Sequence, residues 1–431
     1  MSIVYACFCA DYINKGHLNI INTAKQYGDV IIGVISDKAL IKYNKFPTID
    51  FSERFEIYKK IEGIKDVIIQ EDVMYDEIFK TIKPDYIIHG DNWCSGPEEI
   101  IRKNVLKNIE IYGGNLIEVP YTYDNEIKQQ HDKIRAQLSL PEFRRKRLKQ
   151  CLELCDIVKT IEVHDGITGL IAEKTVVSNN NKIKQFDAMW ISSLCDSTTK
   201  GKPDIELIDM TSRFRTIDDV MEVTTKPIIF DGDTGGLCEH FVYTVRTLER
   251  MGVSAVIVED KIGLKKNSLF GTEVKQEQDS IEHFCEKIKL GKSVQLTNNF
   301  MIIARIESLI LEKGMEDALN RAFAYVKAGA DGIMIHSRSK TPDEIFEFCD
   351  KFREKNSTTP LIVVPSTYNQ VTENELILHK INIVIYANQL IRAAFPAMKK
   401  TAENILLNES AGEINDKLMS IKEIITLIDE L

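Results

Sequence analysis

The stretch PIIFDGDTGG, Pro227–Gly236, joins a run of apolar residues directly to two aspartates and three glycines. The next apolar run in this part of the chain, AVIV at Ala255–Val258, is followed by Glu259, Asp260 and Lys261. Short apolar runs of this kind are typical of strands that are buried on both faces, as in a parallel sheet. Because the carboxyl ends of parallel strands meet at one edge of a sheet, we expect the polar residues after the two runs to lie close together.

The same pattern of strand and helix continues on both sides of this stretch. Eight strands are predicted, at Val158–His164, Ala188–Ser192, Pro227–Asp233, Ala255–Glu259, Met301–Glu307, Gly332–His336, Leu361–Pro365 and Ile383–Ala387. Helical segments separate most of them, for example Glu239–Met251, Glu316–Ala328 and Pro342–Phe352. Eight strand–helix units in this length of chain predict a TIM-type (β/α)8 barrel, whose active site is expected at the C-terminal ends of the strands.

A second α/β pattern precedes the barrel and runs from Ile3 to about Thr122. Its five predicted strands are Ile3–Cys9, Val30–Ile35, Val67–Ile69, Tyr86–His89 and Leu116–Val119, with helices between them such as His17–Gln26 and Ser52–Ile61. Strands that alternate with helices predict a small, doubly wound, Rossmann-like parallel sheet. We therefore expect an α/β chain with a first domain at 1–123, a linker and helix at 124–157, and a barrel with C-terminal helices at 158–431.

Two further segments carry expectations of their own. The polar stretch Asp124–Gln150 is interpreted as a linker that becomes a helix, and its basic run at Arg144–Arg147 as a solvated helix face. The tail, Glu413–Leu431, has apolar residues at helical spacing and predicts an amphipathic helix. Such a helix must bury its apolar face, for instance on a neighbouring subunit.

Composition excludes several classes of function. The 431 residues carry a formal net charge of -10, which argues against a nucleic-acid-binding surface. We expect no signal peptide and no membrane span, because the start of the chain lacks a basic and apolar leader and no apolar run is long enough to cross a bilayer. The nine cysteines are scattered without zinc-ligand spacing, so we expect reduced thiols and a cytoplasmic location.

The predicted strand ends of the barrel gather charged side chains that suggest a metal site. Asp231, Asp233 and Glu259 cannot lie close together while ionised unless a positive charge balances them. Carboxylate oxygens favour Mg2+ that keeps several waters. Arg305, on the fifth strand, suits bidentate binding of a carboxylate or phosphate, and His336 suits hydrogen bonding to a substrate. The alternative, that each carboxylate only caps the helix after its strand, does not explain why the set falls on successive strands.

The polar segment Gly263–Gly271 follows the fourth predicted strand and is interpreted as a mobile lid. Lids that exclude water protect reactive phosphoryl species from hydrolysis.

Several motifs, taken together and in order, resemble the phosphoenolpyruvate mutase family of the isocitrate lyase superfamily. They are FDAMWISSL at Phe186–Leu194, DGDTG at Asp231–Gly235, VEDKIGLKKNS at Val258–Ser268, ARIE at Ala304–Glu307 and IHS at Ile335–Ser337. The resemblance covers about Lys159 to Leu407. It implies a Mg2+-dependent isomerase that interconverts phosphoenolpyruvate and 3-phosphonopyruvate, the step that makes the C–P bond in phosphonate biosynthesis, and it implies a homotetramer.

The resemblance also implies roles for individual residues. It implies a Mg2+ site in which Asp231 binds the ion directly, while Asp233 and Glu259 act through water. The implied catalytic residues are Asp204, Lys265, Asn267, Arg305 and His336, and the implied substrate-binding residues are Trp190, Ser192, Ser193 and Leu194. Ser193 stands where the family usually has glycine. The role of Asp204, as phosphoryl acceptor or as electrostatic guide, stays open.

Other functions with the same fold are weighed against this one. Isocitrate and methylisocitrate lyases carry a catalytic cysteine in the lid, where this chain has Asn267 and Ser268. A phosphonopyruvate hydrolase would use the same metal site but admit water, and Asn267 and Ser268 favour the mutase over it. An inactive scaffold is disfavoured by the intact carboxylate set.

The first domain resembles nucleotidyltransferases of the glycerol-3-phosphate cytidylyltransferase type through Gly16–Asp37 and His89–Trp93. A helix N-terminus after a Gly-containing loop binds phosphate. The resemblance implies that the ligand is CTP. The candidate nucleotide-binding residues are Asn14, Gly16, His17, Lys45, Arg54 and Asp91.

Two departures from the cytidylyltransferase pattern put its activity in doubt. Asn14 replaces the first histidine of the family's His-x-Gly-His motif and carries no positive charge. The family's late Ser/Thr-rich segment is missing after Thr122. Three alternatives therefore stay open: an active CMP transferase, which would make the chain bifunctional, a domain that only binds nucleotide, and a structural remnant.

Overall fold

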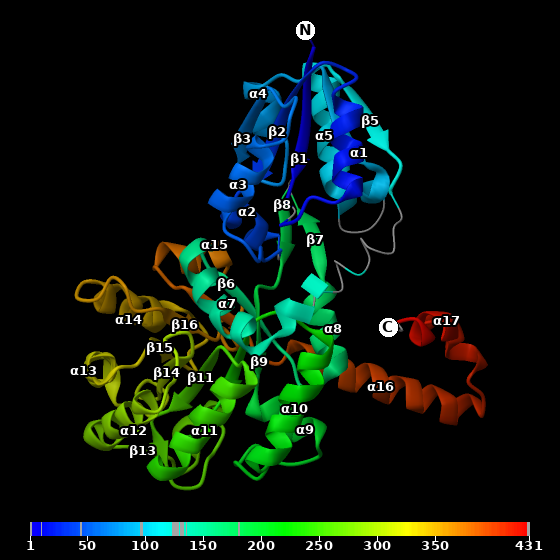
Figure 1. Ribbon diagram of the computed structural model, residues 1–431. Coiled ribbons are helices and arrows are strands. Elements are labelled where there is room, and N and C mark those ends of the chain that lie inside the picture. The colour runs from blue at the N-terminus through cyan, green and yellow to red at the C-terminus, as the bar shows by residue number, and fades with distance from the viewer. Residues whose placement is uncertain are drawn as a thin grey trace. The chain divides into compact units, whose positions relative to one another are not determined.

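The computed structural model of the protein describes residues 2–9, 11–43, 45–94, 98–122, 129, 133–134, 136–179 and 182–428. The chain divides into two compact units, residues 1–386 and 387–431. The first unit contains both a five-stranded parallel sheet and a closed eight-stranded barrel (Figure 1). The mixed α/β architecture predicted from the sequence is therefore confirmed.

The N-terminal sheet has the strand order β3-β2-β1-β4-β5, and all its neighbouring strands are parallel. The strands are β1 (Ile3–Phe8), β2 (Asp29–Ile35), β3 (Asp66–Gln70), β4 (Tyr86–Gly90) and β5 (Asn115–Val119). The helices are α1 (Lys15–Ala24), α2 (Asp37–Lys42), α3 (Phe51–Lys59), α4 (Asp76–Thr81), the 3-10 helix η1 (Asp91–Cys94) and α5 (Glu99–Tyr112). The strand order reverses between β1 and β4, and such a switch point is where ligands bind in doubly wound sheets.

The barrel closes through eight parallel strands in chain order. They are β6 (Val158–Glu162), β9 (Ala188–Ile191), β10 (Ile228–Asp231), β11 (Ala255–Glu259), β14 (Met301–Ile306), β15 (Gly332–Ile335), β16 (Leu361–Val363) and β17 (Ile383–Tyr386). The surrounding helices are α8 (Gly166–Lys174), α9 (Ser193–Thr199), α10 (Met210–Val223), α11 (Cys238–Met251), α12 (Ile281–Ser293), α13 (Gly314–Ala328), α14 (Asp343–Arg353) and α15 (Glu373–Leu378). Each of the eight predicted barrel strands corresponds to one of these.

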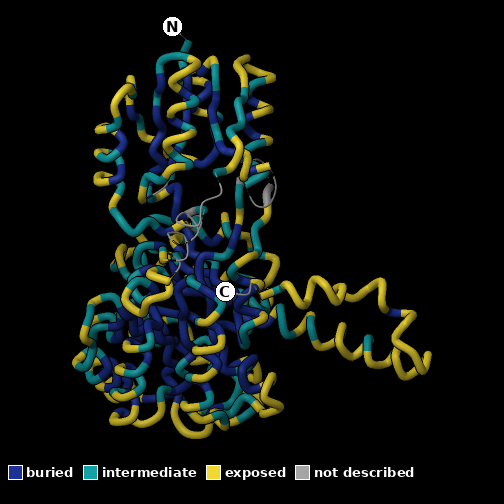
Figure 2. Tube along the Cα trace, turned by 45° about the vertical axis from the view of Figure 1, so that its right-hand side comes forward, coloured by how far each residue is buried: buried dark blue, intermediate teal, exposed yellow. Residues whose placement is uncertain are grey.

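Burial on both faces explains why the barrel strands are apolar without alternation. Every residue of β10, β11 and β14 is buried, and the strands form the dark core of the barrel in Figure 2. Inward side chains fill the barrel and outward ones pack under the helices, so neither face tolerates a regular polar position. Polar residues are therefore displaced to the strand ends, where the predicted site lies.

The loop after β10 has a tightly constrained backbone. A side chain at Gly232 would place its Cβ 2.9 Å from the carbonyl oxygen of Ile257, so only glycine fits there. Asp233 adopts a φ of 52°, in the left-handed region that residues other than glycine seldom occupy. This turn places Asp233 just past the end of the strand, whose last residue is Asp231.

Two short hairpins were not predicted from the sequence. One pairs β7 (Val176–Asn179) with β8 (Lys182–Gln185), and the other pairs β12 (Lys261–Ile262) with β13 (Glu277–Gln278). The second hairpin flanks the lid and the 3-10 helix η3 (Ser268–Glu273) that ends it.

The basic run before the barrel, Arg144–Arg147, is not the solvated helix face that was predicted. It lies in helix α7 (Pro141–Leu154), but Arg144 and Arg147 are almost fully buried rather than solvated. Arg144 donates to the carbonyl oxygen of Lys226 at 3.0 Å, and Arg147 donates to the carbonyl oxygen of Leu138 at 2.8 Å. Free backbone carbonyls at the ends of helices and strands attract these guanidinium groups, which a charge-run argument does not reveal.

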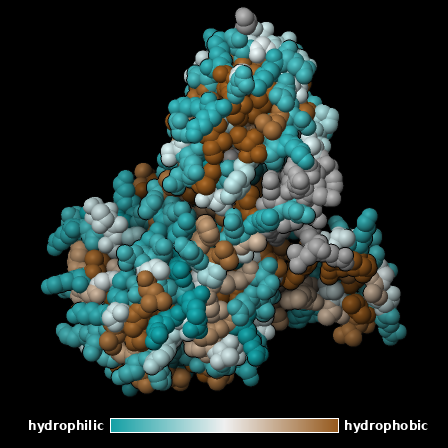
Figure 3. Space-filling model, viewed as in Figure 1, coloured by the Kyte–Doolittle hydropathy of each residue, from teal (hydrophilic) through white to brown (hydrophobic). Residues whose placement is uncertain are grey.

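The second unit consists of the long helix α16 (Gln389–Asn408), the 3-10 helix η4 (Gly412–Lys417) and the short helix α17 (Ile421–Ile425). The single amphipathic helix predicted over Glu413–Leu431 is therefore wrong, because the Ser420 side chain caps a new helix start within it; residues 429–431 lie outside the described part. The unit exposes many apolar side chains (Figures 2 and 3), among them Phe395, Leu406, Leu407, Ile421 and Ile425. The expected homotetramer stays a prediction.

Two smaller expectations are also tested by the structure. All nine cysteines are free thiols. Among the described residues, no helix combines the length and the apolar character needed to cross a membrane. The domain boundaries 1–123, 124–157 and 158–431 stay a prediction, and part of the predicted linker lies outside the described residues.

Candidate active site

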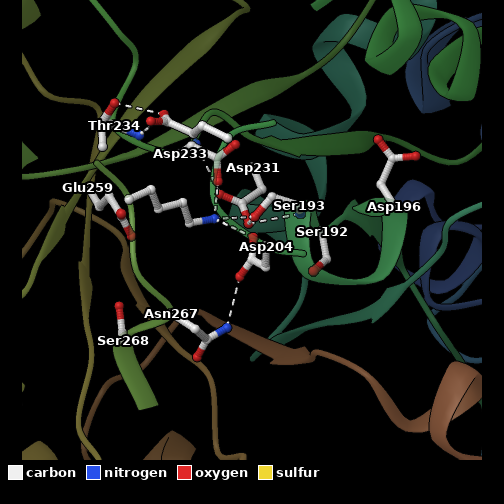
Figure 4. A network of polar contacts seen from close by, with 12 residues as sticks. Ser192, Ser193, Asp196, Asp204, Asp231, Asp233, Thr234, Glu259, Asn267 and Ser268 are labelled. Carbon is white, nitrogen blue, oxygen red and sulfur yellow. Dashed lines mark hydrogen bonds and ion pairs between the residues drawn. The ribbon is translucent and has the colours of Figure 1, made fainter. Parts of the chain in front are cut away.

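The C-terminal ends of three neighbouring barrel strands bring four buried carboxylates to the barrel mouth. Asp231 ends β10, Asp233 follows it by two residues, Glu259 ends β11, and Glu307 follows β14. The residues are between 0 and 5% exposed. Figure 4 shows Asp231 and Asp233, from the end of β10, together with Glu259, from the end of β11. Buried carboxylates at this density require positive partners.

Lys265, from the predicted lid, supplies one of these positive charges. Its ammonium group donates to Oδ1 of Asp204 at 2.8 Å, to Oγ of Ser193 at 2.5 Å, and to Oδ1 of Asp233. Burial lowers the pKa of Lys265, but the charges of Asp233, Asp231 and Glu259 outweigh it and raise the pKa well above its ordinary value. The lysine is therefore held as a cation inside the carboxylate group.

Ser193 joins the lid lysine to the end of β10. Its backbone N–H and its hydroxyl both donate to Oδ2 of Asp231, at 3.1 and 3.0 Å (Figure 4). Ser193 is the first residue of α9, and the neighbouring Ser192 caps that helix by accepting from the N–H of Cys195. The helix cap thus fixes the position from which Ser193 reaches the carboxylate.

Asn267 makes a second contact from the lid to the same aspartate that Lys265 binds. Its side-chain N–H2 donates to Oδ2 of Asp204 at 2.9 Å, while its carbonyl oxygen accepts from the N–H of Leu269 (Figure 4). The neighbouring Ser268 is buried and accepts from Lys261 at 2.9 Å. The segment predicted as a lid is therefore docked on the barrel mouth.

A second cluster surrounds Arg305. Its guanidinium donates to Glu307 at 2.6 Å, to Oγ of Ser268 at 2.6 Å and to Nδ1 of His336 at 2.9 Å. Burial and the charge of Arg305 lower the pKa of His336, so this histidine is neutral and accepts through Nδ1. Arg305 is consequently engaged by protein groups on several sides, with fewer free donors than the sequence suggested.

Glu259 has the features expected of a carboxylate that binds a cation. It is buried, and neither carboxylate oxygen accepts a hydrogen bond from any described residue. Lys261 and Arg305 each lie 3.3 Å from one of these oxygens as ion pairs. Burial raises the pKa of Glu259 to about 7. Unsatisfied hard oxygens of this kind suit a divalent cation such as Mg2+. Among the described residues, however, only Glu162, His164 and Cys195 bring ligand atoms within 4.8 Å of one another as a group of three, so a Mg2+ site of Asp231, Asp233 and Glu259 stays a prediction.

Two positively charged side chains of the site were not predicted from the sequence. Arg213, on α10, donates to Oδ2 of Asp233 at 2.9 Å and to the carbonyl oxygen of Asp231 at 2.6 Å. Lys261 pairs with Glu259 and with Glu307. The position of Lys261, two residues after Glu259, was a usable signal. Arg213 lies on helix α10, and no pattern in the sequence indicates that it reaches the site.

The structure also gathers three residues that no motif predicted. Side-chain donor atoms of Glu162, His164 and Cys195 all lie within 4.8 Å of one another in the buried interior. Nδ1 of His164 is 3.1 Å from Glu162.

The remaining predicted barrel residues are less directly connected. Trp190 is buried, and its Nε1 has no hydrogen-bond partner among the described residues. Leu194 is half-buried in the first turn of α9. The roles assigned from the sequence to all these residues stay predictions.

The N-terminal sheet carries a cavity of about 480 Å3 beside its switch point. Asn14, Gly16, His17 and Lys45 line it. Arg54 is not among the lining residues: it is buried, pairs with Asp37 at 2.5 Å and lies 4.0 Å from Asp11, which does line the cavity. The roles of these residues in nucleotide binding stay predictions.

Asp91 is likewise not among the residues that line the cavity. Its Oδ1 accepts from the N–H of Tyr121 at 2.8 Å and so fixes the local backbone. A carboxylate near a ligand-binding motif can equally well hold a loop, and the role of Asp91 in nucleotide binding stays a prediction.

Several of the polar groups that line the cavity are already paired, although the Tyr43 hydroxyl and Oδ1 of Asp11 have no hydrogen-bond partner among the described residues. The Asn14 side chain caps α1 by accepting from the N–H of His17, and the His17 ring accepts from the N–H of Asn14, which completes a capping box. Lys45 donates to Glu98 at 2.6 Å. His89 stacks on Trp93 with ring centroids 3.6 Å apart.

An eight-stranded parallel barrel with carboxylates, lysines and an arginine buried at its strand ends defines a class: an enzyme built on a (β/α)8 barrel. Residues 148–406 match the family described as phosphoenolpyruvate phosphomutase, and residues 5–138 match the family described as cytidylyltransferase-like. The chain belongs to the phosphoenolpyruvate phosphomutase family and carries an N-terminal cytidylyltransferase-like domain.

Three similar proteins place the barrel within this family. Over 285 residues the chain is 34% identical to phosphoenolpyruvate phosphomutase of Tetrahymena pyriformis, covering 66% of this chain and 91% of that protein. Over 262 residues it is 36% identical to phosphonopyruvate hydrolase of Variovorax sp. (strain Pal2), covering 60% and 89%. A solved structure of phosphonopyruvate hydrolase with oxalate and Mg++ has a TM-score of 0.59 and 32% identity, covering 66% and 94%. Relatives with two different activities are thus about equally similar.

Proposed function

We propose that the barrel interconverts phosphoenolpyruvate and 3-phosphonopyruvate by moving a phosphoryl group between an oxygen and a carbon of one substrate molecule. The observation that carries the proposal is the docked lid, in which Lys265 and Asn267 both bind Asp204 above the buried carboxylates. A phosphoryl group in transit must be kept from water, because hydrolysis would give pyruvate and phosphate.

The donor set of Asp231, Asp233 and Glu259 supports a Mg2+ site. When bound there, the ion would supply positive charge for the enolate and phosphoryl oxygens. Arg213 donates to Asp233 and to the backbone of Asp231, and so holds both carboxylates in place without closing the site. The similar solved structure of phosphonopyruvate hydrolase, which contains oxalate and Mg++, supports this proposal.

The chain's own residues would divide the remaining work. Arg305 places a permanent positive charge at the mouth, because the Glu307 and Glu259 charges raise its pKa even though burial lowers it. Neutral His336 provides a hydrogen-bonding group that does not add charge. Asp204, held by two lid residues, would face the group that moves. The start of α9 would hold the substrate's carboxylate, where the N–H groups of Ser193 and Cys195 already donate to Asp231 and Ser192.

A hydrolase is the alternative, because relatives with both activities are about equally similar. Phosphorus NMR of phosphonopyruvate with Mg2+ and the enzyme separates the two. We expect phosphoenolpyruvate as the product, and none with the Asp204→Ala variant. Inorganic phosphate as the main product would establish the hydrolase instead. Unchanged substrate with folded enzyme would refute both activities.

For the N-terminal domain we propose ligand binding without efficient CMP transfer. The cavity of about 480 Å3 is large enough for a nucleotide. Its cation Lys45 is neutralised by Glu98, and the amide of Asn14 is used as a helix cap. Few positive groups therefore remain for a triphosphate.

Calorimetric titration with CTP and with cytidine tests this second proposal. We expect the affinities for CTP and for cytidine to differ by no more than about tenfold, because few groups in the cavity could bind the phosphates. Pyrophosphate release from CTP and a phosphonate acceptor, at rates typical of an enzyme, would overturn it. No binding of either ligand would leave a structural role.

A further inference from the structure

We infer that the hydroxyl of Ser193 is a positioning group that anchors the lid in its docked state by binding Lys265. The inference concerns the lid itself, and its consequence for product rests on the mutase activity proposed above.

The geometry links three elements through one oxygen. Oγ of Ser193 accepts from the Lys265 ammonium at 2.5 Å and donates to Oδ2 of Asp231 at 3.0 Å. A hydroxyl suits this place because one atom both donates and accepts. Ser193 is 5% exposed and so is Lys265, so water does not compete for the contact. A hydrogen bond to a charged group in such surroundings is stronger than one at the surface.

The Ser193 hydroxyl differs from the other partners of Lys265 because it carries no charge. Asp204 and Asp233 also bind Lys265, but both are carboxylates that attract any cation at the mouth. Ser193 is neutral and fixed on the capped start of α9. It therefore selects one position of the ammonium group among those that Coulomb attraction would allow. Glycine at this position would keep the backbone N–H to Asp231 and lose both the anchor and the hydrogen bond from the hydroxyl to Oδ2 of Asp231.

Limited trypsin digestion of the full chain, followed by mass spectrometry, reads the lid directly. Cleavage after Lys265 and Lys266 requires the lid to leave the mouth. We expect Ser193→Ala to accelerate this cleavage about tenfold, as for loss of one hydrogen bond to a charged group. Ser193→Gly is expected to do the same. The matched control is Thr198→Ala, which removes an exposed hydroxyl from the same helix α9 and should change nothing.

Product analysis by phosphorus NMR provides the second measurement. We expect both Ser193 variants to release a larger share of inorganic phosphate relative to phosphoenolpyruvate than the parent enzyme, because a looser lid admits water. Cleavage rates at Lys265 and Lys266 that equal those of the parent in both variants would overturn the inference. If the parent itself makes only phosphate, the mutase proposal fails, while the digestion still decides the role of Ser193. Circular dichroism confirms that the variants are folded, and either variant suffices if the other is not.

Discussion

The ammonium nitrogen of Lys265 lies 2.8 Å from Oδ1 of Asp204, although 61 residues separate them in the chain. Asn267 binds the other oxygen of the same carboxylate at 2.9 Å. One aspartate in the loop between α9 and α10 thus receives two side chains from the lid. Loss of its charge should therefore affect both the chemistry and the lid.

The first prediction concerns Asp204→Asn. The amide keeps the size of the side chain but lacks the negative charge that Lys265 and Asn267 bind. We expect phosphonopyruvate turnover to fall at least about 100-fold, as is usual when one preorganised polar group is lost from an active site. Tryptic cleavage after Lys265 should also become faster. Turnover within a fewfold of the parent would contradict a role for this carboxylate.

The second prediction concerns the charge of the lid. Asn267→Asp places a carboxylate against Oδ2 of Asp204, and two like charges at this separation repel. The share of substrate released as inorganic phosphate should rise, measured by phosphorus NMR. Leu269→Ala is the control, since Leu269 belongs to the same segment and its side chain is exposed. An unchanged product ratio in Asn267→Asp would argue that this contact does not hold the lid.

The third prediction concerns the proposed metal site. Glu259→Gln keeps the shape of a buried side chain whose oxygens accept no hydrogen bond from a described residue, but it removes a charge. Calorimetry should show Mg2+ affinity reduced at least about tenfold, because hard cations prefer carboxylates over amides. The control is Glu277→Gln on β13, where the side chain is exposed. Equal affinity in parent and Glu259→Gln would remove Glu259 from the site.

The fourth prediction concerns pH and the N-terminal sheet. Hydrogen bonds from Arg102 and Trp93 lower the pKa of Glu118 from 4.5 to about 2. A carboxyl whose pKa is lowered by folding stabilises the fold above its unfolded pKa, and this stabilisation is lost as the pH falls through the folded pKa.

Glu118→Gln should therefore lower the free energy of unfolding by about 1 kcal/mol at pH 7, a value reduced by partial exposure of the pair. The difference from the parent should shrink between pH 4.5 and about 2. Urea unfolding followed by Trp93 fluorescence, in a Trp190→Phe background, measures it. A difference that does not depend on pH would contradict this account.

The fifth prediction concerns Asn14, which replaces a histidine of the cytidylyltransferase pattern. Because its side chain caps α1, Asn14→Ala should destabilise the N-terminal domain by about 1 kcal/mol. Asn14→Asp keeps an accepting oxygen at the helix start and should retain the stability of the parent. The same fluorescence assay applies. If Asn14→Ala is neutral, the cap is not the reason for this residue.

Much of the fold could be predicted because strand patterns are local. The apolar runs at β10, β11 and β14 are bounded by polar residues, and parallel pairing brings their ends together. The carboxylates of the barrel site were found for the same reason. Arg213 was missed because it approaches Asp233 from a helix, so its role depends on packing that no sequence spacing encodes.

Two residues that were predicted to bind nucleotide are paired within the protein, and both cases have one physical cause. Arg54 and Asp91 bear the charges expected of ligand-binding groups, yet Arg54 binds Asp37 and Asp91 binds the backbone of Tyr121. A charged residue near a binding motif satisfies the nearest partner that folding supplies. Only three-dimensional neighbours decide whether that partner is the protein or a ligand.

The buried arginines of α7 have a consequence for how this chain was assembled. Arg144 binds the backbone carbonyls of Thr224 and Lys226, and Arg147 binds that of Thr225, all just before β10, so the helix is a part of the barrel although it precedes the first barrel strand. A barrel gene that began at β6 would encode a protein with those carbonyls uncovered. Any exchange of the N-terminal module during evolution, or by protein engineering, must therefore join the two genes upstream of Pro141.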